Sequence, residues 1–407
     1  MQPFDDLKKH CEKNRNISAA VIDEFLIHYA ADKAHLVPGM ETTIKRYKYA
    51  AADIGTANLN HLRAEYIAHR IFRKDGLIHK FLKHAALQVL PQDEIEFLRY
   101  NSENPWRFSF AVISSNPDDS FFRMEDVMTG EEYLLYSPGM QTTLTEYKPL
   151  LWFNLIGFNG LCWQTFGLMI PFLALTADDI FFFATELNPN IDGEEALMEE
   201  VERNPIPFFM LAAASNKPRI TSRGYVTLTC QSTDIIPDLQ VEKLGASFEV
   251  TKKIDVYRLS LKKLQTFPHF AEAYYNQKTG ELLRTSMTQH GFSMLTAALA
   301  KKGIHLSTEA DIVVSPVMLY TAEKILNRKI VLNPYSQYFS SENEGAEENP
   351  DLSGINTFIG LALPFYNQGK EVDIDKLATQ AGIDPSMAAD LWQQVKKKTD
   401  EMRNKKY

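Results

Sequence analysis

Apolar residues in the first hundred positions recur every three or four residues, which is the spacing of one face of an α-helix. This pattern predicts helices over residues 17–31, 59–72 and 77–90, with Pro91 ending the third. The third predicted helix has the most regular apolar face, formed by Ile78, Phe81, Leu82, Ala85 and Val89. We therefore expect residues 1–100 to form a helical region.

From Trp106 onward the apolar residues alternate with polar ones, as in a strand that buries one face. Short runs separated by turn residues predict five strands, over 106–112, 121–127, 132–136, 151–158 and 161–170. Asn159 and Gly160 join the last two, and this dipeptide suits the positive φ angles of a type I′ hairpin turn. We expect residues 105–190 to form a five-stranded antiparallel meander, followed by a capping helix that begins at Thr176.

Two further blocks follow the predicted meander. Residues 194–335 mix both patterns, with helices expected over 194–203, 290–301 and 316–326. The strand candidates of this block are 208–213, 225–230, 255–261, 270–275 and 281–286. Residues 340–351 are acidic with Ala346 as their one apolar residue, and they form the expected linker to a C-terminal helical unit, 352–407. The predicted fold class is therefore α+β.

The run from Leu150 to Ala177 has no charged residue and raises the question of a membrane segment. Asn, Gly, Gln and Pro interrupt the run repeatedly, and the pair Asn159-Gly160 in its middle is costly in lipid. The run therefore predicts a buried hairpin, and we expect no membrane partner.

Composition and charge narrow the class of protein. The 407 residues include 43 Lys and Arg against 52 Asp and Glu, which gives a net charge of −9 and no global basic surface for nucleic acid. Cys11, Cys162 and Cys230 lie far apart in the sequence and form no Cys-x-x-Cys pair. The first residues lack the basic and apolar regions of a secretory signal. These features predict a cytoplasmic protein in a reducing compartment.

Motifs of known catalytic and cofactor sites are absent, among them Gly-x-Ser-x-Gly, the Walker A loop, Gly-x-Gly-x-x-Gly and His-Glu-x-x-His. We therefore expect no cofactor, and no catalytic residue is assigned. The best metal-like spacing is that of His61, Glu65 and His69, which span about 80° of one helix face. Successive side chains rise by about 6 Å, so a straight helix holds such a site poorly, and a packed histidine is the competing interpretation.

The C-terminal unit has the sequence pattern of a helix-turn-helix. A short helix over 373–381, a turn at Gly382 and a longer helix over 385–398 share an apolar seam. The candidate nucleic-acid contacts are Gln393, Lys396, Lys397, Lys398 and Arg403. The expected DNA-facing surface contains Asp390 and is poor in Arg and Asn, which favours a plain helical hairpin.

The segment 119–136 is predicted to be a strand, a turn and a strand, and the turn contains Asp126, Thr129, Gly130 and Glu131. With the helical region before it, residues 60–170 resemble a β-module of uncharacterised bacterial proteins, many of which carry a SEC-C type zinc motif at the C-terminus. No cysteine follows Cys230 here, so that zinc motif is missing. The resemblance implies no activity and no functional residue.

Three hypotheses for the function remain. The absence of catalytic motifs and the several predicted units favour a non-enzymatic binding or adaptor protein with a protein partner. The first alternative is a DNA-binding regulator that uses the C-terminal helices. The second alternative is an enzyme whose site is assembled from distant residues, with His61 and His69 as candidate metal ligands.

Overall fold

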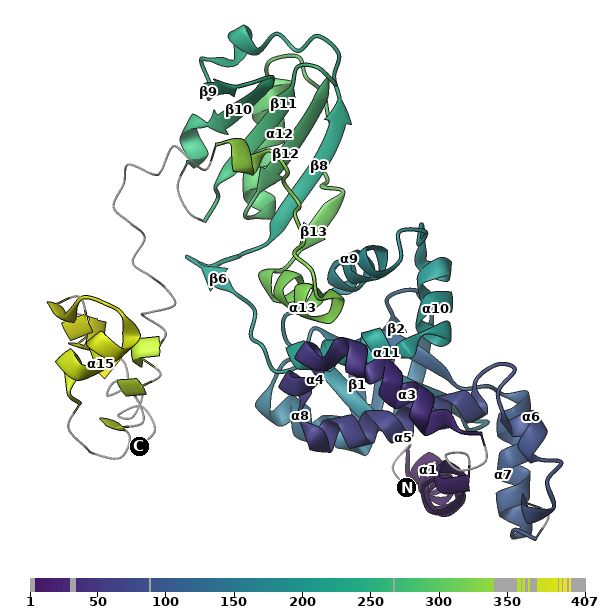
Figure 1. Ribbon diagram of the computed structural model, residues 1–407. Helices are drawn as coiled ribbons and strands as arrows, with labels where there is room; N and C mark the ends of the chain where they lie inside the picture. Colours follow the sequence, from purple (N-terminus) through teal and green to yellow (C-terminus); the bar gives the residue numbers. More distant parts are fainter. Residues whose placement is uncertain are drawn as a thin grey trace. The chain divides into compact units, whose positions relative to one another are not determined.

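The computed structural model describes residues 4–29, 34–87, 89–265 and 268–339, together with parts of the segment 357–396. The described parts of that segment are 357–359, 361–362, 365–366, 372–386, 388–389, 391–393 and 395–396. The chain divides into two compact units, Met1–Asn333 and Pro334–Tyr407. Helices and sheets both contribute to the architecture, so the chain belongs to the α+β class (Figure 1).

The N-terminal region is helical, as its apolar spacing predicts. α1 (Asp5–Ser18) continues into a π-helix, η1 (Ala19–Leu26), and α5 (Thr56–Phe72) contains the expected helix 59–72. The remaining helices here are α3 (Leu36–Ile44), η2 (Lys45–Tyr47), α4 (Lys48–Ile54), α6 (Ile78–Phe81), η3 (Ala85–Leu87) and α7 (Gln92–Glu103). The single helix predicted over 77–90 is wrong, because turns separate α6 from η3. Phe81 and Leu87 are both buried while Val89 is 84% exposed. Packing of Phe81 and Leu87 in the core therefore overrides the local preference for one continuous helix.

The five strands expected between residues 106 and 170 are all present and form a closed barrel. They are β1 (Arg107–Asp118), β2 (Phe121–Asp126), β3 (Glu132–Tyr136), β4 (Leu151–Phe158) and β5 (Trp163–Phe172). The strand order is β1-β2-β3-β5-β4, with β4 paired to β1 and β3 parallel to β5. The predicted antiparallel meander is therefore wrong in its order, because α8 (Pro138–Glu146) intervenes between β3 and β4. A parallel pair requires a crossover of this kind.

α8 also closes part of the barrel interior. Met140 of α8 belongs to the same hydrophobic cluster as Phe122, Trp152 and Ile156 of the strands. A five-stranded barrel in this order, with a helix between its third and fourth strands, has the topology of the OB fold.

One large hydrophobic core joins the barrel to the helices around it. The helices that follow the barrel are α9 (Ala177–Leu187), α10 (Glu194–Arg203), α11 (Pro205–Phe209), η4 (Met210–Ala214) and α13 (Pro316–Leu326). The helix start predicted at Thr176 and the helices predicted over 194–203 and 316–326 are confirmed, and Thr176 and Asp179 form a capping box at that start. The strand predicted over 208–213 is wrong, since a short apolar run does not distinguish strand from helix and Pro205 favours a helix start. Residues of the expected blocks 1–100, 105–190 and 194–335 thus share this core.

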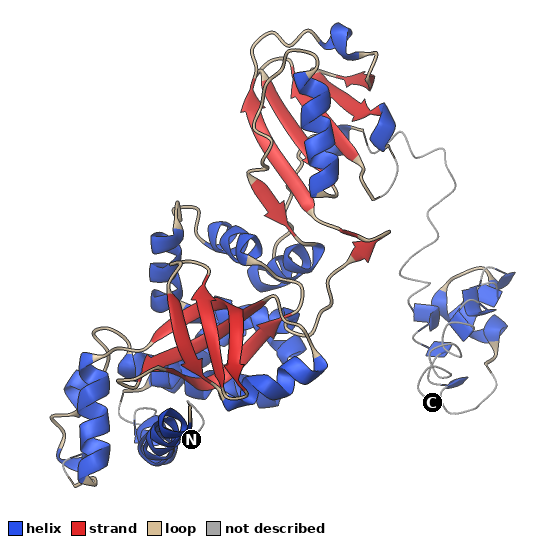
Figure 2. Cartoon of the chain, turned by 180° about the vertical axis from the view of Figure 1, so that it is seen from behind, coloured by secondary structure: helices blue, strands red, loops and turns tan. Residues whose placement is uncertain are grey.

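The rest of the expected mixed block forms a six-stranded antiparallel sheet in the order β13-β8-β12-β11-β10-β9. Its strands are β8 (Thr229–Ile235), β9 (Phe248–Lys253), β10 (Val256–Leu261), β11 (Ala271–Asn276), β12 (Glu281–Ser286) and β13 (Ile312–Val314). α12 (Gln289–Ala300) lies across one face of the sheet, where Leu295 and Leu299 pack against Leu259 and Leu282 (Figure 2). The remaining short elements are β6 (Thr221–Ser222), β7 (Tyr225–Val226), η5 (Val241–Leu244), η6 (Lys262–Leu264) and η7 (Ser336–Tyr338).

The C-terminal unit has its own hydrophobic cluster, which includes Phe358, Leu377, Ala378, Ile383 and Trp392. α15 (Ile374–Ala381) begins at Asp373, whose carboxylate accepts a hydrogen bond from the backbone N–H of Lys376 at 3.1 Å. Gly382 has a φ of +71°, so the chain leaves α15 through a left-handed residue, as many helices do. The expected linker, 340–351, lies outside the described residues.

No helix among the described residues is long and apolar enough to span a bilayer. The uncharged run 150–177 contains the paired strands β4 and β5, so the expected buried hairpin is confirmed. Its turn is not type I′, because Gly160 has a positive φ of +93° and Asn159 does not. Instead, the Asn159 side-chain oxygen accepts hydrogen bonds from the backbone N–H groups of Leu161 and Cys162. Such a side-chain turn replaces the backbone geometry that the dipeptide predicts.

Candidate functional site

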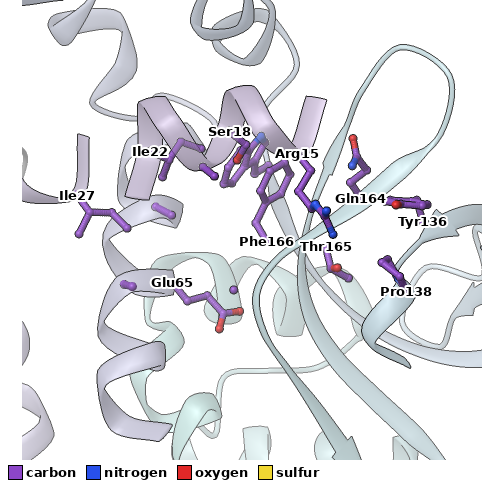
Figure 3. Close-up of a pocket in the computed structure, with 15 residues that line it drawn as sticks. Arg15, Ser18, Ile22, Ile27, Glu65, Tyr136, Pro138, Gln164, Thr165 and Phe166 are labelled. Atoms are coloured by element: carbon purple, nitrogen blue, oxygen red, sulfur yellow. The ribbon is translucent and has the colours of Figure 1, made fainter. Parts of the chain in front are cut away.

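A cavity of about 200 Å³ lies between the N-terminal helices and the barrel (Figure 3). α1 and η1 form one wall, α5 forms a second, and β5 forms a third. Its lining includes the side chains of Arg15, Ile22, Glu65, Trp106, Thr165 and Phe166. An engineered apolar cavity of about 150 Å³ is known to bind benzene, so this cavity has room for a small organic molecule.

Glu65 is the buried acid of this cavity and is 2% exposed. One of its oxygens, Oε2, accepts a hydrogen bond from the backbone N–H of Leu168 at 3.2 Å. Burial raises the pKa of Glu65 well above its usual range, while hydrogen bonds from the backbones of Leu168 and Leu155 oppose that shift. Among the described residues no cation forms an ion pair with this carboxyl. The surroundings therefore favour the neutral carboxylic acid, which carries one O–H donor.

Two of the elements that line the cavity with Glu65, β5 and η1, have an irregular backbone. The pairing of β4 with β5 shifts between Phe153 and Leu155, which marks a bulge in the strand that faces α5. Gly167 in this stretch has a φ of +85°, and a Cβ at that position would lie 3.0 Å from atoms of the Glu65 side chain. Across the cavity, η1 is a π-helix. Bulges and π-helices are both enriched near functional sites, so three unusual features meet at one cavity.

Arg15 lies at the opposite end of the cavity from Glu65 (Figure 3). The residue is exposed, and its guanidinium has no carboxylate partner among the described residues. In Figure 3 this group points toward Thr165 of β5. The apolar side chains of Ile22 and Phe166 also line the cavity. The lining of the cavity thus combines a cation, apolar side chains and a buried acid.

The structure does not bring His61, Glu65 and His69 together as ligands. His61 is exposed, whereas His69 is fully buried with Nε2 at 2.6 Å from Oε2 of Glu202. Burial lowers the pKa of His69 and the hydrogen bond to Glu202 opposes that shift, so the neutral imidazole donates this hydrogen bond. No group of three or more His, Cys, Asp or Glu side chains in the described part of the chain is placed to hold a metal ion. The structure therefore gives the metal interpretation of this spacing no support, since helix rise and burial separate the three side chains.

The candidate nucleic-acid residues are only partly within the described chain. Gln393 and Lys396 are exposed, and the Lys396 ammonium lies 6.0 Å from the ring centroid of Tyr366. Lys397, Lys398 and Arg403 lie outside the described residues. DNA binding by this unit therefore stays a prediction.

The residues that carry the SEC-C resemblance stabilise a turn of the barrel. Oδ1 of Asp126 accepts hydrogen bonds from two backbone N–H groups of the β2–β3 turn, at 3.0 and 3.1 Å. Arg107 of β1 donates to Asp126 at 3.0 Å and to Glu131 at 2.6 Å. Gly130 supplies the positive φ of +69° that the turn needs. These contacts give the segment a structural role in joining β1 to the β2–β3 hairpin.

The outer face of β2 and β3, which is the usual ligand surface of an OB fold, is covered in this chain. Phe121 of β2 and Tyr136 of β3 are buried in a cluster with Leu7 and Cys11 of α1. Phe4, just before α1, stacks on Phe121 with ring centroids 5.0 Å apart. An oligonucleotide therefore cannot reach these two aromatic rings while α1 is in place.

Comparison of the chain with protein-family models, with curated proteins and with solved structures finds no match. The geometry of the cavity is therefore the basis on which a function can be inferred.

Proposed function

We propose that this protein is a non-enzymatic binding protein that holds a small organic acid in the cavity between η1, α5 and β5. The observation that carries the proposal is Glu65, a buried carboxyl that has no cationic partner among the described residues and lines a cavity. Burying an ionisable group without a counterion destabilises the fold, and strongly perturbed acids in concave sites are candidates for function.

The cavity selects the class of ligand by its two polar ends. At one end, the guanidinium of Arg15 offers several N–H donors in the geometry that binds a carboxylate. Ile22 and Phe166 offer apolar contacts to the body of the ligand. At the other end, the carboxylic acid of Glu65 can donate a hydrogen bond to an acceptor. A volume of about 200 Å³ favours a monocarboxylate of roughly eight or nine non-hydrogen atoms.

The residues around the cavity favour binding over catalysis. Among the described residues no histidine and no cysteine lines it, so the hydroxyl groups of Ser18 and Thr165 have no histidine in that part of the chain as a general base. Arg15 and Glu65 can position a ligand without forming a covalent bond to it. This arrangement supports the non-enzymatic form of the hypothesis.

The proposal is tested by calorimetric titration of the full-length protein with benzoate and hexanoate, and with benzamide as the uncharged analogue. We expect saturable binding of the acids and about tenfold weaker binding of benzamide, which lacks the charge-assisted contact. Arg15→Ala should weaken benzoate binding by a similar factor without changing stability, because Arg15 is exposed.

Lys13→Ala is the matched control, since Lys13 is an exposed cation of α1 that does not line the cavity. Equal affinity for benzoate and benzamide, or equal losses in the Arg15 and Lys13 variants, would contradict the proposed site.

A second candidate function is DNA binding by the C-terminal unit. It is favoured by the succession of α15, the left-handed Gly382 and further helical residues from Pro385, as in a helix-turn-helix. The test is an electrophoretic mobility shift with duplex DNA at low salt, comparing the full chain with a chain truncated at Asp351. Binding that falls steeply with salt and is lost on truncation supports this function, and no shift at low salt rejects it.

A further inference from the structure

Two cysteines that lie far apart in the sequence are in contact where α1 packs on the barrel. The Sγ atoms of Cys11 and Cys162 are 3.4 Å apart, and the two residues are 0% and 2% exposed. The side-chain amide of Asn159 donates to both sulfurs, at 3.3 and 3.6 Å. Cys230 of β8 is also buried, but neither of the other cysteines accompanies it.

The two thiols are chemically unequal. The hydrogen bond from Cys162 lowers the pKa of Cys11, the Asn159 amide adds to that effect, and burial opposes it. The same contact with Cys11, together with burial, raises the pKa of Cys162. The thiolate is the reactive form of cysteine, so Cys11 is the nucleophile of the pair and Cys162 is the resolving thiol.

We propose that Cys11 and Cys162 form a redox-modification site at which a hydroperoxide converts the thiol pair into a disulfide that ties α1 to the end of the β4–β5 turn. With hydrogen peroxide, the Cys11 thiolate attacks one peroxide oxygen and the O–O bond breaks. Cys11 becomes a sulfenic acid, and the departing hydroxide takes a proton to give water. The Cys162 sulfur then attacks the sulfenic sulfur, the S–O bond breaks, and a second water leaves with the Cys162 thiol proton. Two thiols and one peroxide thus give one disulfide and two waters.

Access of the peroxide requires α1 to lift from the barrel, because both sulfurs are buried in the present arrangement. The buried residues of α1 are Cys11 and Ser18, and elements with few buried contacts open at lower free energy than the core. Its polar contacts with the barrel include the hydrogen bond from Asn14 to Gln164 at 2.7 Å. Oxidation should therefore be slower than that of an exposed thiol, and the disulfide should then restrict the opening of α1.

The proposal is tested on the reduced full-length protein treated with hydrogen peroxide and digested without reduction. We expect a mass loss of about 2 Da and a cross-linked peptide pair that joins Cys11 to Cys162. Amide hydrogen exchange in α1 should slow in the oxidised protein and recover after dithiothreitol. The Cys230→Ser variant, which removes the third buried cysteine, should form the same cross-link. Cross-links that involve Cys230 in the wild-type chain, or Cys11 and Cys162 that stay reduced while other methionine or cysteine sites oxidise, would overturn the proposal.

The same disulfide should affect the cavity, because α1 contributes Arg15 and Ser18 to its wall. This consequence rests on the proposed function. We expect benzoate to dissociate more slowly from the oxidised protein than from the reduced one. Peptide mapping and hydrogen exchange test the disulfide without any ligand, so failure of benzoate binding and failure of disulfide formation are separate results.

Discussion

Glu65 in the barrel region and Arg284 in the six-stranded sheet are both buried ionisable residues, but their surroundings differ. Arg284 is 0% exposed, and its Nε and Nη2 donate to Asp234 at 3.2 and 3.0 Å. Its Nη1 donates to Thr296 at 2.6 Å and to the Ser307 carbonyl at 2.8 Å. The guanidinium also lies 4.8 Å from the ring centroid of Phe292. Every nitrogen of this side chain therefore has a protein partner.

Arg284 has a counterion and side-chain partners. Glu65 instead accepts hydrogen bonds from backbone N–H groups and lines a cavity. A buried charge that is fully partnered is explained by the fold, because its desolvation is offset by specific contacts. A buried acid without a counterion is not explained in this way. Burial alone therefore does not mark an ionisable residue as functional. A buried ionisable residue is a candidate for function when its charge lacks a counterion.

The largest loss of stability is expected when the hydrogen bonds and the ion pair of Arg284 are removed. Arg284→Leu should lower the free energy of unfolding by about 3 kcal/mol, because it leaves Thr296 and the Ser307 carbonyl without their donor and Asp234 without its cation. Urea denaturation of the full chain measures this loss. Lys278→Ala, which removes a more exposed ion pair with Asp255, should leave the stability almost unchanged. A loss below about 1 kcal/mol in the Arg284 variant would show that its partners contribute little.

A smaller loss of stability is expected when a larger residue at Gly167 prevents β5 from approaching Glu65 closely. Gly167→Ala should destabilise the protein by about 2 kcal/mol, because φ is +85° there and the new Cβ would meet Glu65 at 3.0 Å. The same variant should lose benzoate binding. Gly193→Ala is the control, since Gly193 has extended backbone and nothing within 4 Å of its added Cβ. Equal stability of the two variants would argue against a tight contact between β5 and Glu65.

The effect of Glu65 itself should depend on pH. Because the folded state raises the pKa of Glu65, the folded chain keeps a proton that the unfolded chain loses above its ordinary value of about 4.5. The contribution of Glu65 to stability therefore falls as pH rises from that value toward the raised pKa. Glu65→Gln cannot ionise, so its stability relative to the wild type should rise over this window by up to about 1.4 kcal/mol per pH unit. Urea denaturation of both proteins between pH 4 and 8 measures the difference, and a difference independent of pH would contradict the raised pKa.

Local signals along the chain predict several elements well. α9 begins after Thr176 as predicted, and α10 and α13 have the predicted bounds. The strands of the barrel lie where alternating patterns and turn residues place them. These signals depend on neighbours within a few residues, so one sequence suffices to detect them.

The candidate site was only partly detectable in this way. Glu65 lies three residues after Leu62 and three before Ala68, so its helix face is apolar and its burial is predictable. Its spacing from two histidines instead suggested a metal, and the structure separates the three side chains. Arg15 carried no local signal, because an exposed arginine on a helix is ordinary.

The α+β class, most strands and the helices with clear caps or apolar faces can be predicted from the sequence, because these features depend on local propensity and periodicity. Tertiary structure alone decided that β3 pairs with β5, that Phe208 lies in a helix, and that Cys11 meets Cys162. It also decided that α1, α5 and β5 enclose a cavity around Glu65. The physical reason is that these outcomes depend on pairing and burial between residues far apart in the chain, for which hydrophobic spacing specifies a face but not its partner.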